Sequence, residues 1–147
     1  MPEQTSSAML DREPGRVDDQ MTVRVLIVDD QAPFRQAERV VVELADGFEV
    51  AGEAESGEAS IDLTRQVRPD LVLMDVHLPG IDGVEAARRI HADAGEHLPL
   101  VLLLSTYEAG DYARLAVECG AIGYLPKSEL DADVLVAIWE TCIGAGA

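Results

Sequence analysis

Basic residues are scarce in this 147-residue chain, and lysine is almost absent. Eleven lysines and arginines stand against 28 aspartates and glutamates, which gives a formal charge of −17 at pH 7. Sequence-independent binding to nucleic acid or to anionic lipid needs a cationic face, so this balance argues against both. Lys127 is the only lysine. An arginine-biased composition would leave the same pattern, so the lone lysine supports a functional role without establishing it.

Cysteines, aromatic residues and long apolar runs are also few. Cys119 and Cys142 are too few for a disulfide framework, and their spacing matches no zinc motif. Aromatic residues make up 4% of the chain, so alanine, valine and leucine must fill the interior. No stretch has the length of a signal-peptide core or of a bilayer-spanning helix. We therefore expect a cytoplasmic protein without a membrane partner.

The composition changes abruptly near residue 21. The segment before it is rich in Pro, Gly, Ser, Asp and Glu and has no periodicity, which predicts a disordered tail over 1–21 and one folded domain over 22–147.

Pro69 should end the second helix and push Arg68 toward an extended conformation.

Within the folded domain, continuous apolar runs alternate five times with helix-length segments. This alternation predicts an α/β fold in which a parallel sheet is buried on both faces by helices. The strands are expected at about 23–28, 48–53, 70–75, 99–104 and 122–125, and the helices at about 33–45, 57–68, 83–92, 110–119 and 129–143. The second strand alternates polar and apolar residues and should form an edge of the sheet.

Polar residues follow four of the apolar runs. They are Asp29 with Asp30, then Asp75, then Ser105 with Thr106, and last Lys127 after Pro126. The carboxyl ends of parallel strands share the edge at which ligands bind, so these side chains should meet there. Two carboxylates about 4 Å apart repel each other by roughly 4 kcal/mol at an effective dielectric near 20. Three of them therefore predict a bound cation, and a small site of hard oxygen ligands favours Mg²⁺.

This set of residues fits phosphoryl transfer. Asp75 can attack phosphorus to give an aspartyl phosphate, while Lys127 and Ser105 contact phosphoryl oxygens. Each element alone has a simpler interpretation: an Asp-Asp pair often caps a helix, and a single lysine is usually just solvated. Their joint position at corresponding strand ends favours one site.

Four motifs carry a resemblance to a known family. They are VLIVDD at 25–30, LVLMDVHLPGIDG at 71–83, LLLSTYE at 102–108 and GAIGYLPKS at 120–128. Over about residues 23–143 the chain resembles the receiver domains of two-component response regulators, most closely those of helix-turn-helix transcription factors. The resemblance implies a flavodoxin-like (βα)5 three-layer sandwich with the sheet order 2-1-3-4-5.

The resemblance also implies roles for individual residues. Asp75 is the phosphoacceptor, and Asp29, Asp30, Asp75 and the backbone carbonyl of His77 bind Mg²⁺. Ser105 is the switch hydroxyl, Tyr124 the switch aromatic residue and Lys127 the phosphate-contacting lysine. Three further residues beside the site are expected to modulate the reaction: His77, Thr106 and Tyr107. An ordinary exposed loop histidine is the simpler interpretation of His77.

The implied function is a switch that takes a phosphoryl group from a sensor histidine kinase or a phosphotransfer protein. It then changes a surface that binds an unknown downstream protein or a second copy of the chain. It catalyses only its own phosphorylation and dephosphorylation, and it binds no nucleic acid directly. Two alternatives remain: a receiver that acts by protein contact without phosphate, and a small aspartate-nucleophile phosphatase. The second is weakened because His77 stands where such enzymes want another acid.

One feature departs from the family pattern. Receiver domains commonly have proline directly after the lysine, whereas here Pro126 precedes Lys127 and Ser128 follows it. We therefore expect the loop that carries Lys127 to differ in shape.

Overall fold

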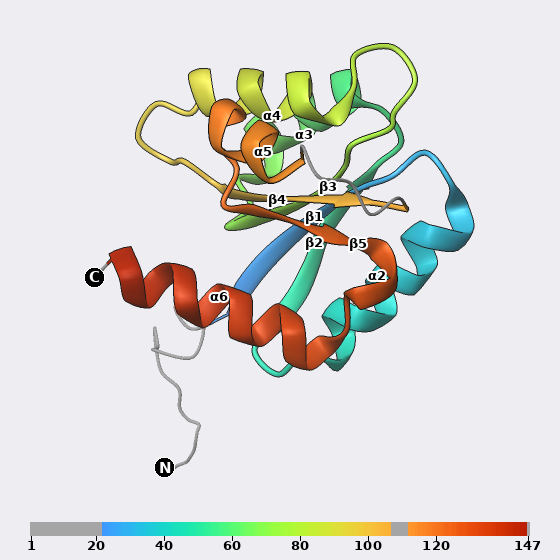
Figure 1. Cartoon of the computed structure of the whole chain (residues 1–147), viewed down its shortest axis with the longest axis vertical. Helices are drawn as coiled ribbons and strands as arrows, with labels where there is room; N and C mark the ends of the chain where they lie inside the picture. Colours follow the sequence, from blue (N-terminus) through green and yellow to red (C-terminus); the bar gives the residue numbers. More distant parts are fainter. Residues whose placement is uncertain (1–21, 107–111, 147) are drawn as a thin grey trace.

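Parallel strands form a single sheet at the centre of the protein (Figure 1). The computed structural model describes residues 22–106 and 112–146, so the tail expected over 1–21 and Tyr107 lie outside the described residues. The strands are β1 (Val23–Val28), β2 (Phe48–Ala54), β3 (Leu71–Asp75), β4 (Leu100–Ser105) and β5 (Gly123–Pro126). Their order is β2-β1-β3-β4-β5, and every neighbouring pair is parallel. The expected sheet order is confirmed, with β2 at an edge.

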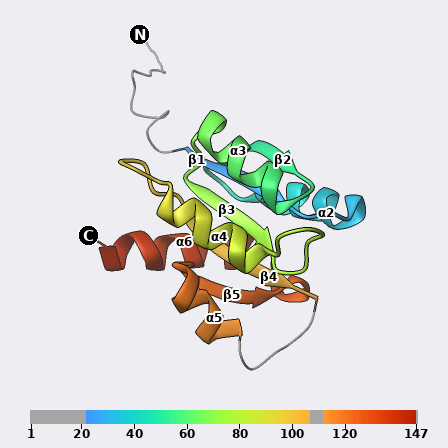
Figure 2. The same ribbon diagram turned by 90° about the horizontal axis from the view of Figure 1, so that it is seen from above.

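Helices cover both faces of this sheet. They are α2 (Ala32–Leu44), α3 (Gly57–Val67), α4 (Gly83–Ala92), α5 (Tyr112–Cys119) and α6 (Ala132–Gly146), with a short 3-10 helix η1 (Lys127–Glu129) before α6. Figures 1 and 2 show α3, α4 and α5 on one face and α2 and α6 on the other. The result is the expected three-layer α/β sandwich. None of the described helices is long and apolar enough to cross a lipid bilayer.

The apolar runs are continuous because both faces of the strands are buried. Leu26 and Met74 pack toward α3, α4 and α5, whereas Ile27 and Leu73 pack toward α2 and α6. All four side chains are fully buried. Adjacent residues of one strand thus belong to opposite halves of the core, so the runs 25–28 of β1 and 71–74 of β3 are apolar at every position.

The last helix begins later than the sequence predicts. The expected start near residue 129 is wrong, because residues 127–129 form η1 and α6 starts at Ala132. The carboxylate of Asp131 accepts a hydrogen bond of 2.8 Å from the backbone N–H of Val134. Asp131 therefore caps this helix, and the preceding turn stays separate from it.

The prediction for Arg68 is also wrong. Its backbone is left-handed, with φ 49° and ψ 64°, rather than extended. Its N–H donates to the carbonyl of Thr64 at 2.9 Å, which closes the end of α3. The guanidinium of Arg24 donates to the carbonyls of Val67 and Arg68. These bonds outweigh the preference of a residue before proline for extended geometry.

Candidate functional site

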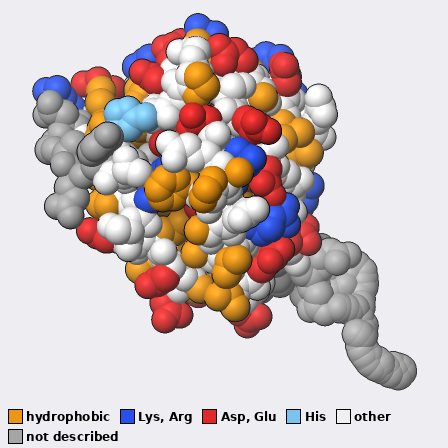
Figure 3. All heavy atoms as spheres, turned by 90° about the vertical axis from the view of Figure 1, so that its right-hand side faces the viewer, with side chains coloured by type: hydrophobic (Ala, Val, Ile, Leu, Met, Phe, Trp, Pro, Cys, Tyr) orange, Lys and Arg blue, Asp and Glu red, His pale blue; other side chains and the backbone are white. Residues whose placement is uncertain are grey.

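Three carboxylates meet at the carboxyl edge of the sheet, as the sequence predicts. Asp75 ends β3, and Asp29 and Asp30 directly follow β1. Each offers an oxygen that lies within 4.8 Å of the oxygens of the other two. Asp29 and Asp75 are buried, whereas Asp30 is exposed. Figure 3 looks onto this side of the protein, where acidic side chains in red lie close to a basic one in blue.

The side chain of Lys127 lies between the two buried carboxylates. Its Nζ is 2.6 Å from Asp29 Oδ2 and 3.4 Å from Asp75 Oδ2. The same ammonium sits 4.0 Å from the centre of the Phe34 ring, a cation–π contact that sequence reasoning missed. Lys127 therefore reaches the carboxyl edge although Pro126 precedes it, and its charge compensates part of the repulsion between the two aspartates.

Backbone N–H groups fix the orientation of the two buried carboxylates. The N–H of His77 donates to Asp75 Oδ1 at 3.1 Å, and the N–H of Gln31 donates to Asp29 Oδ1 at 2.9 Å. Both Oδ2 atoms are thus left to face Lys127. Burial raises the pKa of Asp75 above its usual value, and the charge of Asp29 adds to this effect, although Lys127 and the bond from His77 oppose it.

A glycine allows the backbone to pass close behind Asp75. A Cβ on Gly83, the first residue of α4, would lie 2.0 Å from the Asp75 carbonyl oxygen. The N–H of Gly83 donates to the carbonyl of Val76 at 2.8 Å, which ties the start of α4 to the end of β3. The position of Asp75 therefore depends on the absence of a side chain at residue 83.

A fourth carboxyl group, from Glu38 on α2, lies behind the site. It is 4% exposed, and neither of its oxygens has a hydrogen-bond partner among the described residues. Burial, followed by the charge of Asp29, raises the pKa of Glu38 to about 9. Sequence reasoning missed this residue. The one signal in the sequence was its spacing, because Glu38, Val42 and Ala45 fall on one face of the helix.

The remaining predicted residues lie on neighbouring elements. Ser105 is fully buried at the end of β4 and pairs with Pro126 of β5, while Thr106 after it is exposed. Tyr124 is half-buried on β5. Ser105 and Thr106 thus stand at the same edge of the sheet as Asp75 and Lys127.

A tyrosine that sequence reasoning missed connects two of these elements. The hydroxyl of Tyr112, at the start of α5, is 2.8 Å from His77 Nε2. The rings of Tyr112 and Tyr124 are 4.9 Å apart between centroids. His77 is exposed, and Tyr112 links it to Tyr124 because Tyr112 contacts both residues. The sequence carries no signal for this contact, which exists only once the loop after β3 and the start of α5 are placed together.

A sheet of this order, with three carboxylates and a lysine at its carboxyl edge, defines the receiver class of α/β domains. The chain belongs to the response regulator receiver domain family, whose model matches residues 25–139.

Among its relatives is the transcriptional regulatory protein DegU of Brevibacillus brevis, which is 34% identical over 127 residues, or 85% of this chain and 52% of DegU. A solved LuxR-family response regulator from Aurantimonas sp. SI85-9A1 is 34% identical, with a TM-score of 0.75 over 84% of this chain and 86% of that one. The receiver domain of the putative regulator NarL from Mycobacterium tuberculosis is 30% identical, with a TM-score of 0.75 over 84% and 98% of the two chains. The chain spans about half the length of the curated relatives it matches.

Proposed function

We propose that this receiver domain is a phosphoacceptor, with Asp75 as the residue that carries the phosphoryl group. The observation that carries the proposal is the position of Lys127, whose Nζ is within 3.4 Å of both buried aspartates. An ammonium at this point can contact an oxygen of a phosphoryl group on Asp75, because lysine binds phosphate as a mobile point charge.

The chemistry is a displacement at phosphorus. An ionised oxygen of Asp75 attacks the phosphorus of a phosphohistidine, the new O–P bond forms, and the P–N bond breaks with its electron pair moving to the imidazole. Hydrolysis reverses the outcome: water attacks the same phosphorus and the aspartate oxygen leaves. Lys127 compensates the charge that develops on the phosphoryl oxygens, and Ser105 is the proposed hydroxyl donor to another of them.

A divalent cation fits the donor set at this edge. Asp29, Asp30 and Asp75 would hold it, together with the backbone carbonyl of His77, because all of these are hard oxygen ligands. Mg²⁺ bound there would neutralise charge on the transferring group. Without it, Lys127 is the one basic side chain that compensates the buried carboxylates Asp29 and Asp75 among the described residues.

The proposed output is a shift between two conformations. Ser105 and Tyr124 are the switch pair, and a phosphoryl group changes the balance only by binding the two states unequally. Moving such an equilibrium from about 1:99 to 99:1 takes roughly 5.5 kcal/mol of differential interaction. Thr106 and His77 beside the site are proposed to tune the lifetime of the phosphoryl group. Tyr107, which lies outside the described residues, keeps the same expected role.

The proposed partners follow from this chemistry. A sensor histidine kinase or a phosphotransfer protein in the cytoplasm supplies the phosphoryl group, and a downstream protein or a second copy of the chain reads the changed surface. The chain itself makes no direct contact with nucleic acid and has no enzymatic activity beyond its own phosphorylation and dephosphorylation. Its relatives named as transcriptional regulators support an output in transcription.

The decisive experiment is intact-mass analysis after incubation with Mg²⁺ and acetyl phosphate. We expect a gain of one phosphoryl group that disappears with EDTA and in Asp75→Asn. The matched control Asp46→Asn, which changes an exposed aspartate between α2 and β2, should still gain it. No gain, under conditions that label an established receiver, would replace the proposal with a receiver that acts by protein contact alone.

A further inference from the structure

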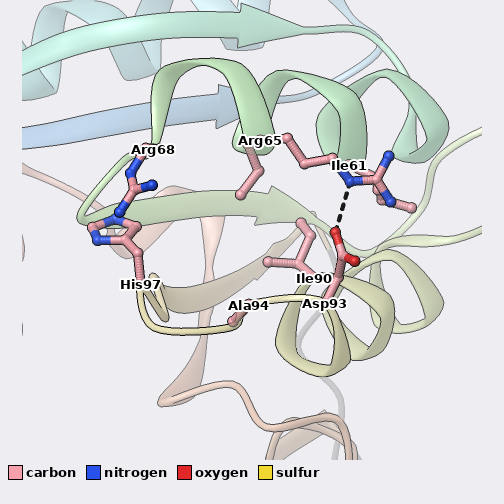
Figure 4. Close-up of a pocket in the computed structure, with 8 residues that line it drawn as sticks. Ile61, Arg65, Arg68, Ile90, Asp93, Ala94 and His97 are labelled. Atoms are coloured by element: carbon pink, nitrogen blue, oxygen red, sulfur yellow. Dashed lines mark hydrogen bonds and ion pairs between the residues drawn. The ribbon is translucent and has the colours of Figure 1, made fainter.

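A pocket lies away from the acidic edge, between the carboxyl-terminal ends of α3 and α4 (Figure 4). Its volume is about 190 Å³. Six of the residues that line it determine its chemical character: Ile61, Arg65, Arg68, Ile90, Asp93 and His97. The pocket is smaller than a typical drug-sized site, so it suits a small ligand.

Arg68 brings an uncompensated positive charge to this pocket. Every other basic residue that the structure describes lies within 4.0 Å of a carboxylate oxygen. For the guanidinium of Arg68, neither an ion pair nor a hydrogen bond occurs within the described part of the chain. Arg68 is exposed, so its guanidinium is open to a ligand that arrives from solvent.

The backbone of Arg68 is held in an unfavourable conformation. It is the only non-glycine residue with a positive φ in the described ranges. Left-handed geometry is unfavourable for residues with a Cβ and persists where surrounding contacts impose it, which often happens at functional sites. Here the bonds from Arg24 and to Thr64 impose it. In Figure 4 the Arg68 side chain points toward the ring of His97.

His97 is fixed in place as part of the pocket wall. Its Nε2 donates to the carbonyl of Pro69, the residue after Arg68, at 2.7 Å. The side chains of Arg68 and His97 therefore meet at one end of the pocket. Among the residues that the structure describes, no carboxylate pairs with Arg68.

The other walls explain why the charge stays uncompensated. Asp93 is the acidic residue in the lining, and its Oδ2 is bound by the Nε of Arg65 at 2.7 Å. This pair joins α3 to the residue that directly follows α4 and is drawn as a dashed line in Figure 4. Ile61 and Ile90 add an apolar surface. The pocket thus combines a free guanidinium with a short apolar wall.

We propose that this pocket binds a small carboxylate, whose oxygens accept hydrogen bonds from Arg68 while its short apolar chain contacts Ile61 and Ile90. Arginine binds carboxylates with two parallel N–H···O bonds, which supplies both the charge and the orientation. The apolar wall favours a carboxylate with a short carbon chain over an inorganic oxyanion. The proposal is independent of phosphoryl transfer at Asp75.

The test is a titration of the ¹⁵N-labelled full chain with sodium propionate, followed by backbone amide shifts. Sodium chloride at the same ionic strength is the blank, and inorganic phosphate is a second probe. We expect saturable shifts over residues 64–69 and 93–97 with propionate. Arg68→Gln should weaken binding about tenfold or more, because a charge-assisted bond is lost. Arg88→Gln, which changes an exposed arginine of α4 outside the pocket, should leave it unchanged.

Any of four results would overturn the proposal. The first is the absence of saturable shifts up to about 50 mM propionate, well beyond millimolar affinity. The second is an equal response in the parent chain and in a folded Arg68→Gln variant. Saturable shifts with phosphate but not with propionate would reject a carboxylate ligand. Shifts confined to residues near Asp75 would report on the acidic site instead and would equally reject this pocket.

Discussion

Glu38 offers a quantitative test of the electrostatics around the site. It is buried on α2 behind Asp29, and burial, aided by the charge of Asp29, raises its pKa from 4.5 to about 9. At pH 7 the folded protein therefore holds Glu38 protonated, and the protonated group can donate a hydrogen bond to Asp29. In the unfolded chain the same side chain is ionised.

The sign and the size of the effect follow from this difference. Between pH 4.5 and about 9 the folded state binds one proton more than the unfolded state at Glu38, so the free energy of unfolding falls as the pH rises. The slope is at most about 1.4 kcal/mol per pH unit. At pH 7, about 2.5 units above the ordinary value, Glu38 lowers stability by about 3 kcal/mol relative to acid pH. Glu38→Gln keeps the shape and the ability to donate but cannot ionise, so it should remove this loss.

The assay is urea unfolding in EDTA at several pH values between about 5 and 8. Trp139, the only tryptophan, packs against Phe48 and reports on folding by fluorescence. We expect Glu38→Gln to exceed the parent chain by less than about 1 kcal/mol near pH 5 and by about 3 kcal/mol at pH 7. Glu43→Gln, on the same helix but exposed, should change stability by less than about 0.5 kcal/mol at every pH. A difference between Glu38→Gln and the parent that stays constant across this range would refute the reasoning.

Two further predictions concern residues that shape the site. Gly83→Ala should lower the free energy of unfolding by about 3 kcal/mol or more, because the added Cβ would meet the carbonyl oxygen of Asp75. Gly123→Ala has open space around the added Cβ and should cost little. Equal urea midpoints for the two variants would contradict the close approach of residue 83 to Asp75. Lys127→Met should destabilise the chain in EDTA by about 3 kcal/mol, because it leaves buried carboxylates without their cation. Mg²⁺ should then stabilise this variant more than the parent. An equal increase in the free energy of unfolding for both would contradict a common site for Mg²⁺ and the Lys127 ammonium.

Much of the fold was predictable because burial on both faces leaves a simple pattern. The strands appear in the sequence as continuous apolar runs, and the polar residues after them mark the carboxyl edge, so the pattern alone was enough to place Asp29, Asp75 and Lys127 together. Helix starts were less predictable. Asp131 and Ser128 are both acceptable caps by residue type, and the selection of Asp131 depends on where the chain leaves β5.

The contacts that the sequence could not supply involve charged side chains whose partners are set by tertiary structure. Glu38 is buried and protonated beside Asp29, whereas Arg68 is exposed and has no carboxylate partner among the described residues. The position of Glu38 on the same helical face as Val42 indicated burial, but only the fold shows that Glu38 lies behind Asp29. For Arg68 the sequence led to a wrong prediction, because a residue before proline is expected to be extended. Its left-handed turn depends on Arg24, 44 residues earlier in the chain, and no local pattern encodes a contact over that distance.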